Sequence, residues 1–407
     1  MTTSTLPAPA VLQQPPAGGR ARATVGKALW VTLMVVVAGG CGWLLYSDLD
    51  AAIGDRAISY GALFAFAPVV PLVAVFWWLG LVRPEPLHLL VIALVWGALV
   101  ATYASLQLNS WLAVALGGGQ GAGPRTAVFV APWVEECLKA TVIFAIAWWR
   151  RHDFNGLIGG AVYAGLAGIG FAFTENVVYY GQIFQHSLDL GRGDGAALDA
   201  VQGLFIWRGV AAPFVHPMFT MMTGIGIGIA IRHRHLGVRI VAPVVGYCTA
   251  VLLHMSYNTA ASFAGSRALV AVYLGVLVPL LLIFGLVVAL IRRYERRVIE
   301  ARLQDYTVYG WLKATQVPFL VSNPGRRDLR RHARAIGRPE RRRVRELQRA
   351  GVDLGLLRDR LVRGVAGERE RTREAQLIAA VRHLLARVSF PDGHGSAPEL
   401  PPLGSSW

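Results

Sequence analysis

Residues 127–149 read AVFVAPWVEECLKATVIFAIAWW, an apolar run that contains two adjacent glutamates and a lysine. A helix of about 20 apolar residues is long enough to cross the hydrocarbon core of a bilayer. A charged side chain near the middle of that core costs about 2.5–3.5 kcal/mol on insertion scales. Glu135, Glu136 and Lys139 must therefore pair, lose their charge or bind a metal. The stretch predicts a membrane helix that contributes to a functional site.

The composition of the whole chain agrees with a polytopic membrane protein. Of its 407 residues, 54% are hydrophobic and 16% are charged, whereas about 25% of residues are charged in a typical soluble domain. Apolar runs of span length recur up to residue 291, so we predict an all-α bundle of about eight transmembrane helices. The expected spans are 28–47, 59–82, 86–106, 127–149, 157–181, 208–231, 238–262 and 268–291.

The basic residues are distributed unequally between the two sides of this predicted bundle. One side carries most of the Lys and Arg residues between spans, including Arg150, Arg151 and Arg232, together with the tail that begins at Arg292. The other side carries six aspartates and four arginines. Because cytoplasmic loops are enriched in Lys and Arg, both termini are expected in the cytoplasm, as an even number of spans requires.

The chain divides by composition into four parts. Residues 1–27 are rich in Pro, Ala and Gly and are predicted to be disordered, and residues 28–291 form the transmembrane domain. Residues 292–390 are predicted to be a basic helical cytosolic tail, and residues 391–407 a disordered C-terminus. The segment from 292 to the end holds 25 Lys and Arg against 13 Asp and Glu, which is +12 of the net charge of +16.

Three interpretations of the basic tail are open: a small cytosolic helical hairpin, a membrane-surface anchor or a nucleic-acid binder. Basic residues beside a membrane gain about 1 kcal/mol each from anionic lipid. The tail has acidic residues interspersed and no nucleic-acid-binding motif. We therefore expect anionic lipid, and no nucleic acid, as the partner of the tail.

Ionisable residues in the interior of the predicted spans are few, and they lie at similar depths. Counted from the predicted outer ends of four helices, Glu135, Glu175, His216 and His254 lie six to eight residues in, which is about 9–12 Å. The shared depth predicts one site, and small-residue pairs such as Gly224-x-x-x-Gly228 would let the helices approach closely. The set consists of Glu135, Glu136, Lys139, Glu175, His216 and His254.

Two histidines and three carboxylates could hold a catalytic zinc ion, which takes three protein ligands and one water molecule. His216 and His254, with Glu175 or Glu135, would be the ligands. A remaining carboxylate, by preference Glu136, would act as the general base toward metal-activated water. The chain has no H-E-x-x-H pattern, so spacing and composition alone leave metal binding open.

Two further residues have expected roles in the same site. Lys139 would hold its carboxylate partner ionised or stabilise the developing oxyanion. Asn258 lies one helical turn past His254 and is placed to donate a hydrogen bond to that oxyanion.

Four segments of the chain resemble the motifs of the PrsW family of intramembrane proteases, which is related to the CAAX prenyl endopeptidases. Residues 132–139 (PWVEECLK) match the family's E-E-x-x-K, and residues 171–176 (FAFTEN) match its F-x-x-x-E. Residues 216–220 (HPMFT) and 254–258 (HMSYN) match its two histidine motifs. The four segments occur in order within about 127–262, the expected catalytic core.

The resemblance implies an endopeptidase that cuts a membrane-tethered protein, such as a single-span anti-sigma factor, near its outer face. It also implies a multi-pass protein of a bacterial plasma membrane. The family is commonly regarded as metallo-type, whereas its CAAX-processing relatives have been argued to activate water with a glutamate and no metal. A metal-free protease is therefore the first alternative. Those relatives carry His where Glu175 stands here, so their catalytic assignments do not transfer to this position.

Other interpretations use the same residues differently. A proton-coupled transporter could relay protons through buried Glu and His, but transporters often contain two similar halves, and the first three predicted spans hold no counterpart of the charged cluster. A scaffold whose tail recruits partners is a third possibility. A single histidine in a membrane helix often only joins two helices. The shared depth and the order of the motifs favour catalysis.

Overall fold

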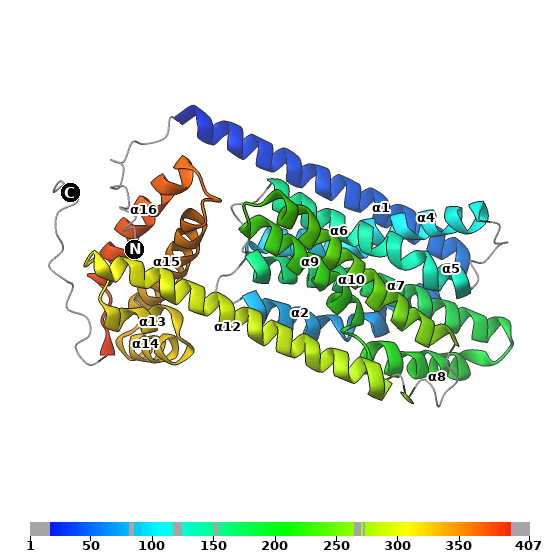
Figure 1. Ribbon diagram of the computed structural model, residues 1–407. Helices are drawn as coiled ribbons and strands as arrows, with labels where there is room; N and C mark the ends of the chain where they lie inside the picture. The colour runs from blue at the N-terminus through cyan, green and yellow to red at the C-terminus, as the bar shows by residue number, and fades with distance from the viewer. Residues whose placement is uncertain are drawn as a thin grey trace. The chain divides into compact units, whose positions relative to one another are not determined.

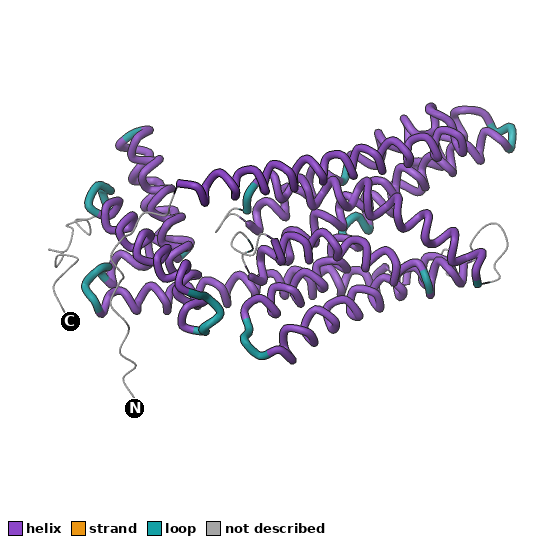
Figure 2. The backbone as a smooth tube through the Cα atoms, turned by 90° about the horizontal axis from the view of Figure 1, so that it is seen from above, coloured by secondary structure: helices purple, strands orange, loops and turns teal. Residues whose placement is uncertain are grey.

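The computed structural model of the chain describes residues 17–80, 85–116, 124–149, 154, 156–263, 270–271 and 273–391. Every secondary-structure element among these residues is a helix, which confirms the all-α class (Figure 2). Of the segments predicted to be disordered, 1–27 and 391–407, residues 1–16 and 392–407 lie outside the described residues. Helix α1 begins at Ala17, so residues 17–27 are helical where disorder was predicted. The chain forms two compact units, one of residues 18–231 and 235–287 and one that contains 232–234 and the chain from 288 on.

The first unit is a bundle of helices (Figure 1). Most of them are α-helices, and three short stretches are π-helical. The elements are α1 (Ala17–Phe66), α2 (Val69–Leu79), α3 (Leu87–Val95), η2 (Trp96–Ala101), α4 (Thr102–Ala115), α5 (Pro124–Phe129), α6 (Ala131–Trp149), α7 (Gly156–Asp189), α8 (Gly193–Phe205), η3 (Ile206–Ala211), α9 (Val215–Arg232), α10 (Leu236–Phe263), η4 (Tyr273–Leu277) and α12 (Val278–Val308), which continues into the second unit.

Six helical stretches among the described residues are long and apolar enough to cross a membrane, which makes the chain a multi-pass membrane protein. The predicted number of eight is not confirmed. The stretch Leu29–Leu79 has 51 residues, far more than the roughly 20 that one crossing needs, and it is interrupted at Gly54, whose φ of 76° favours glycine. Helix α6 is not among the six and carries three charged residues, Glu135, Glu136 and Lys139.

Helix α7 lies at the centre of the bundle, and 83% of the apolar 18-residue stretch within it is buried. Glycines let other backbones approach it closely. A Cβ atom on Gly160 would lie 2.0 Å from the carbonyl oxygen of Gly224 in α9, and one on Gly170 would lie 1.9 Å from that of Leu94 in α3. A Cβ on Gly168 would lie 2.7 Å from the carbonyl oxygen of His216. The predicted role of small residues in close helix packing is therefore confirmed.

The predicted span 208–231 is divided in the structure. The π-helix η3 ends at Ala211 and α9 begins at Val215, with Pro213 in the break. Proline has no N–H to donate and disfavours a helical conformation in the residue before it. His216 therefore lies in the first turn of α9 instead of eight residues inside a helix. Since α7 also extends to Asp189, the depths counted from the predicted ends do not describe these two helices.

The second unit is also helical, as predicted for the tail. It continues from α12 through η5 (Ala314–Gln316), α13 (Val317–Val321), α14 (Asn323–Ile336), α15 (Arg338–Val362) and α16 (Glu368–Leu385). These helices pack around a small apolar core. Among its fully or almost fully buried side chains are those of Leu320, Leu329, Val344, Leu347, Val381 and Leu385.

Candidate active site

Glu136 connects three helices of the membrane unit. Its Oε1 atom accepts a hydrogen bond from Nζ of Lys139 at 2.8 Å and lies 3.1 Å from Nδ1 of His254. Its Oε2 atom accepts a hydrogen bond from the hydroxyl of Thr220 at 2.8 Å. All four side chains are buried. Glu136 and Lys139, which stand three residues apart on one face of α6, therefore form an ion pair, and the same carboxylate also holds α9 and α10 to α6.

The ammonium of Lys139 meets several groups besides Glu136. Its Nζ atom lies 3.4 Å from Nδ1 of His216 and 3.9 Å from Oε2 of Glu135. It also lies 3.7 Å from the centroid of the Phe171 ring, a cation–π contact. Phe171 belongs to α7, so this buried cation is in contact with α6, α7 and α9. Its charge is balanced locally by two carboxylates and an aromatic face.

A second ion-pair chain runs from α7 to α9. Oε2 of Glu175 lies 2.7 Å from Nε2 of His216, at ion-pair distance but without hydrogen-bond geometry. The same oxygen accepts a hydrogen bond from Nη2 of Arg208 at 2.8 Å. Nε of Arg208 donates to Oδ1 of Asn176, also at 2.8 Å. Arg208 thus holds two adjacent residues of α7 and, through Glu175, contacts a histidine of the site.

Sequence reasoning missed Arg208. It stands at the first position of the predicted span 208–231, where an arginine resembles an ordinary helix end. The structure places it instead in the π-helix η3, with its guanidinium 4.2 Å from the centroid of the Tyr179 ring. The available signal was one arginine within the apolar run from Leu204 to Val210. Single-turn π-helical insertions are frequent at functional sites.

Glu135 lies at the edge of the cluster, whereas the side chain of Asn258 makes no hydrogen bond with the other predicted site residues, all of which the structure describes. Oε1 of Glu135 accepts a hydrogen bond from Asn109 at 3.4 Å. Its buried Oε2 lies 3.7 Å from Nε2 of His254 and has no hydrogen-bond partner among the residues that the structure describes. The amide of Asn258 donates to the carbonyl oxygen of Ala127 at 3.0 Å. One hydrogen of that amide is therefore engaged, and the other is left for a different acceptor.

Three of these side chains form a possible metal site. Glu136, His216 and His254 are buried, and each offers a ligand atom within 4.8 Å of the other two. Two imidazoles and one carboxylate are a known ligand set of catalytic zinc. Nε2 of His254 is buried without a hydrogen-bond partner among the described residues. This ring nitrogen is therefore available to bind a metal ion. The set contains Glu136 where the sequence-based expectation placed Glu175 or Glu135.

Comparison with known proteins agrees with this arrangement. A family model described as "PrsW family intramembrane metalloprotease" matches residues 85–287. The matched range contains α6, α7, η3, α9 and α10, and with them every residue of the cluster. None of the curated proteins and none of the solved structures matches the chain. Over residues 85–287, the chain therefore belongs to the PrsW family of intramembrane metalloproteases, which are peptide hydrolases.

Proposed function

We propose that this chain hydrolyses a peptide bond of a membrane-tethered protein, near the outer face of a bacterial plasma membrane. A single-span protein that resembles an anti-sigma factor is the kind of substrate we expect. The observation that carries the proposal is the convergence of Glu136, His216 and His254 from three helices, beside Oε2 of Glu135, which accepts no hydrogen bond from the residues that the structure describes. The unequal distribution of Lys and Arg supports cytoplasmic positions for both termini.

The donor atoms fit a zinc ion held by Glu136, His216 and His254. When bound, such an ion supplies Lewis acidity, which polarises a carbonyl group and lowers the pKa of a water molecule. Glu175 would then orient the ligand His216 without binding the ion itself. A histidine that binds a metal through one ring nitrogen commonly donates its other N–H to a carboxylate. Oε2 of Glu175 lies 2.7 Å from Nε2 of His216, without hydrogen-bond geometry, and Nδ1 of the same ring lies 3.4 Å from Nζ of Lys139, so the ion would take the place of Lys139 at Nδ1.

Among the carboxylates of the site, Glu135 is best placed to accept a proton from the water molecule. The sequence alone favours Glu136 as the general base, but Glu136 already contacts Lys139, His254 and Thr220. Glu135 has one oxygen without a hydrogen-bond partner among the described residues, and this oxygen faces His254. We assign Glu135 the proton transfer. Lys139 and the second amide hydrogen of Asn258 stabilise the developing oxyanion.

A metal-free protease is the alternative that one observation favours. The ammonium of Lys139 lies 2.8 Å from Glu136 and 3.4 Å from Nδ1 of His216. A cation that belongs to the protein therefore already balances the carboxylate. In this arrangement a glutamate activates the water molecule directly, as argued for the CAAX-processing relatives.

Metal content of the purified chain distinguishes these two mechanisms. The protein is extracted in a mild detergent without chelators, and bound metal is measured by mass spectrometry alongside cleavage of a single-span reporter in proteoliposomes. We expect about one zinc ion per chain, lost in His216→Ala and in His254→Ala. His186→Ala, which changes an exposed histidine, is the matched control and should keep both metal and cleavage.

Two other outcomes have clear meanings. Reporter cleavage by a wild-type protein without metal, abolished by Glu136→Gln, would replace the zinc mechanism by the metal-free one. Metal that survives both histidine substitutions would reject this ligand set.

A further inference from the structure

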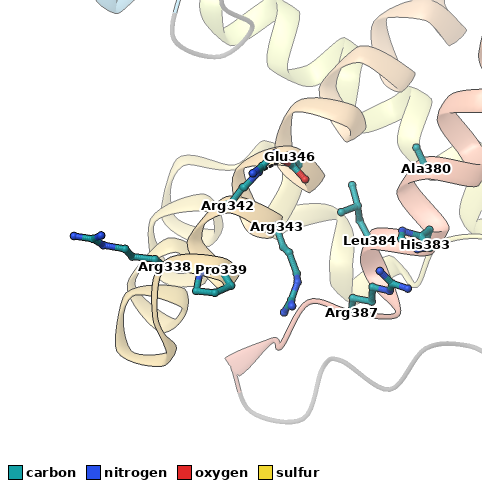
Figure 3. Close-up of a pocket in the computed structure, with 9 residues that line it drawn as sticks. All are labelled: Arg338, Pro339, Arg342, Arg343, Glu346, Ala380, His383, Leu384 and Arg387. Atoms are coloured by element: carbon teal, nitrogen blue, oxygen red, sulfur yellow. Dashed lines mark hydrogen bonds and ion pairs between the residues drawn. The ribbon is translucent and has the colours of Figure 1, made fainter.

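The C-terminal unit contains a cleft of about 740 Å³ that no part of the proposed protease mechanism uses. It lies between the first turns of α15 and the end of α16 (Figure 3). The whole cleft lies outside residues 85–287, the range that the family model matches. Its basic lining residues are Arg338, Arg342, Arg343, His383 and Arg387.

The positive charge of this cleft is only partly neutralised. Nε of Arg342 donates to Glu346 at 2.8 Å, and Nη1 of Arg343 donates to Glu340 at 2.9 Å. The guanidinium groups of Arg338 and Arg387, which line the cleft, have no ion-pair or hydrogen-bond partner among the described residues. Glu346 is the one acidic residue that lines the cleft. Two guanidinium groups are therefore available to an anion.

One arginine of the cleft is held in place by buried structure. Glu340 is buried, and besides Arg343 it accepts a hydrogen bond from the backbone N–H of Ser389 at 2.7 Å. The start of α15 is thereby tied to the segment that follows α16. Figure 3 shows Arg343 and Arg387 at the cleft from these two parts of the chain. An arginine whose position is already fixed loses less entropy when it binds a ligand.

The surroundings of the cleft are also strongly basic. Residues 323–349 contain eleven arginines and three acidic residues. Burial and the neighbouring Arg345 and Arg334 lower the pKa of Arg330. Burial and Arg330 lower the pKa of Arg326 to about 10. The arginines of α14 and α15 thus repel one another, and a bound anion would relieve that repulsion.

We propose that this cleft binds a multiply charged phosphate group, carried either by a soluble phosphorylated compound or by a phospholipid headgroup. The planar guanidinium presents two parallel donors that match phosphate oxygens. The cleft volume lies within the range of about 300–1,000 Å³ that small-molecule sites occupy. The anionic lipid expected from the sequence is one of the two sources. This binding does not depend on the proposed proteolytic mechanism.

The test uses the full chain in phosphatidylcholine nanodiscs, titrated with inorganic pyrophosphate in a calorimeter. The double substitution Arg338→Ala and Arg387→Ala removes two side chains that make no ion pair among the described residues, so the fold should be kept. Arg327→Ala with Arg349→Ala removes the same charge from exposed positions outside the cleft lining. We expect the cleft variant to weaken pyrophosphate binding about 10-fold or more, and the control variant to bind almost as the wild type does.

A second set of nanodiscs, which contains phosphatidylglycerol, distinguishes the two phosphate sources. If a headgroup occupies the cleft, pyrophosphate binding by the wild type falls in these discs, and native mass spectrometry finds phosphatidylglycerol on the wild type but not on the cleft variant. If the ligand is soluble, binding is the same in both kinds of disc. Equal weakening by the cleft and control variants would overturn the proposal, as would a wild type that does not bind pyrophosphate in phosphatidylcholine discs.

Discussion

The membrane site and the C-terminal cleft both gather charged side chains, but they balance the charge differently. In the membrane site, Glu136 and Lys139 are buried and in direct contact, and Arg208 contacts Glu175. In the cleft, Arg338 and Arg387 are exposed and have no partner among the described residues. A charge buried without a partner costs several kcal/mol, whereas an exposed one remains hydrated and needs no partner.

Because of this difference, charged side chains contribute to helix packing in the membrane site, whereas in the C-terminal cleft they are available for ligand binding. In the membrane unit, the charged groups themselves connect the helices, since Glu136 contacts α6, α9 and α10 at once. In the C-terminal unit, fully buried apolar side chains such as Leu329 and Val344 connect the helices together with a few buried polar groups such as Glu340. The exposed guanidinium groups of Arg338 and Arg387, which form no ion pair among the described residues, can therefore bind a ligand. Equivalent substitutions should therefore have unequal effects in the two regions.

The largest expected difference is between two buried glutamates. Glu136→Gln should reduce cleavage of a single-span reporter by about 10²–10⁴-fold, because the site loses a negative charge that contacts two cationic or metal-ligating groups. Glu340→Gln changes a carboxylate that is equally buried but lies in the C-terminal unit, and it should leave cleavage unchanged. Initial rates in proteoliposomes measure both. Equal losses would mean that the C-terminal unit takes part in the chemistry.

A smaller difference is expected between two arginine–glutamate pairs. Arg208 uses two different nitrogens for Asn176 and Glu175, and a lysine cannot reproduce that fork. Arg208→Lys should lower the cleavage rate about 10–100-fold, as expected for a group that orients a ligand, and should lower zinc affinity with it. Arg343→Lys keeps a charge beside Glu340 and should have no effect on cleavage. An Arg208→Lys enzyme with normal activity and metal content would exclude the positioning role.

The smallest effect should come from the surface pair Arg342–Glu346, whose side chains are 81% and 49% exposed. Exposed pairs contribute little to stability, so Arg342→Ala should leave Tm unchanged. Lys139→Met is the contrasting variant, because it leaves Glu136 buried without its ammonium partner. It should lower Tm clearly, as measured by thermal unfolding in detergent. Similar Tm values for the two variants would contradict the distinction between buried and exposed charge.

Contacts that depend on residue spacing along one helix could be predicted from the sequence. The spacing of Glu136 and Lys139 places them on one helix face, so their ion pair could be predicted. The helix-contact role of Gly160 and Gly224 was also predictable from small-residue spacing. The number of spans was harder to predict from hydropathy, because the charged residues of α6 lower its hydropathy and one long apolar stretch is interrupted at Gly54.

Hydropathy and helical periodicity are properties of neighbouring residues, so the sequence alone predicts a helical membrane protein with Glu, Lys and His residues inside its spans. Only the tertiary structure decided how the carboxylates divide their contacts. Glu136 meets His254, while Glu175 meets His216 and Arg208. It also decided that α9 begins beside His216 and that Arg208 turns toward α7. These are contacts between helices, and the period of one helix carries no information about which face of another it meets.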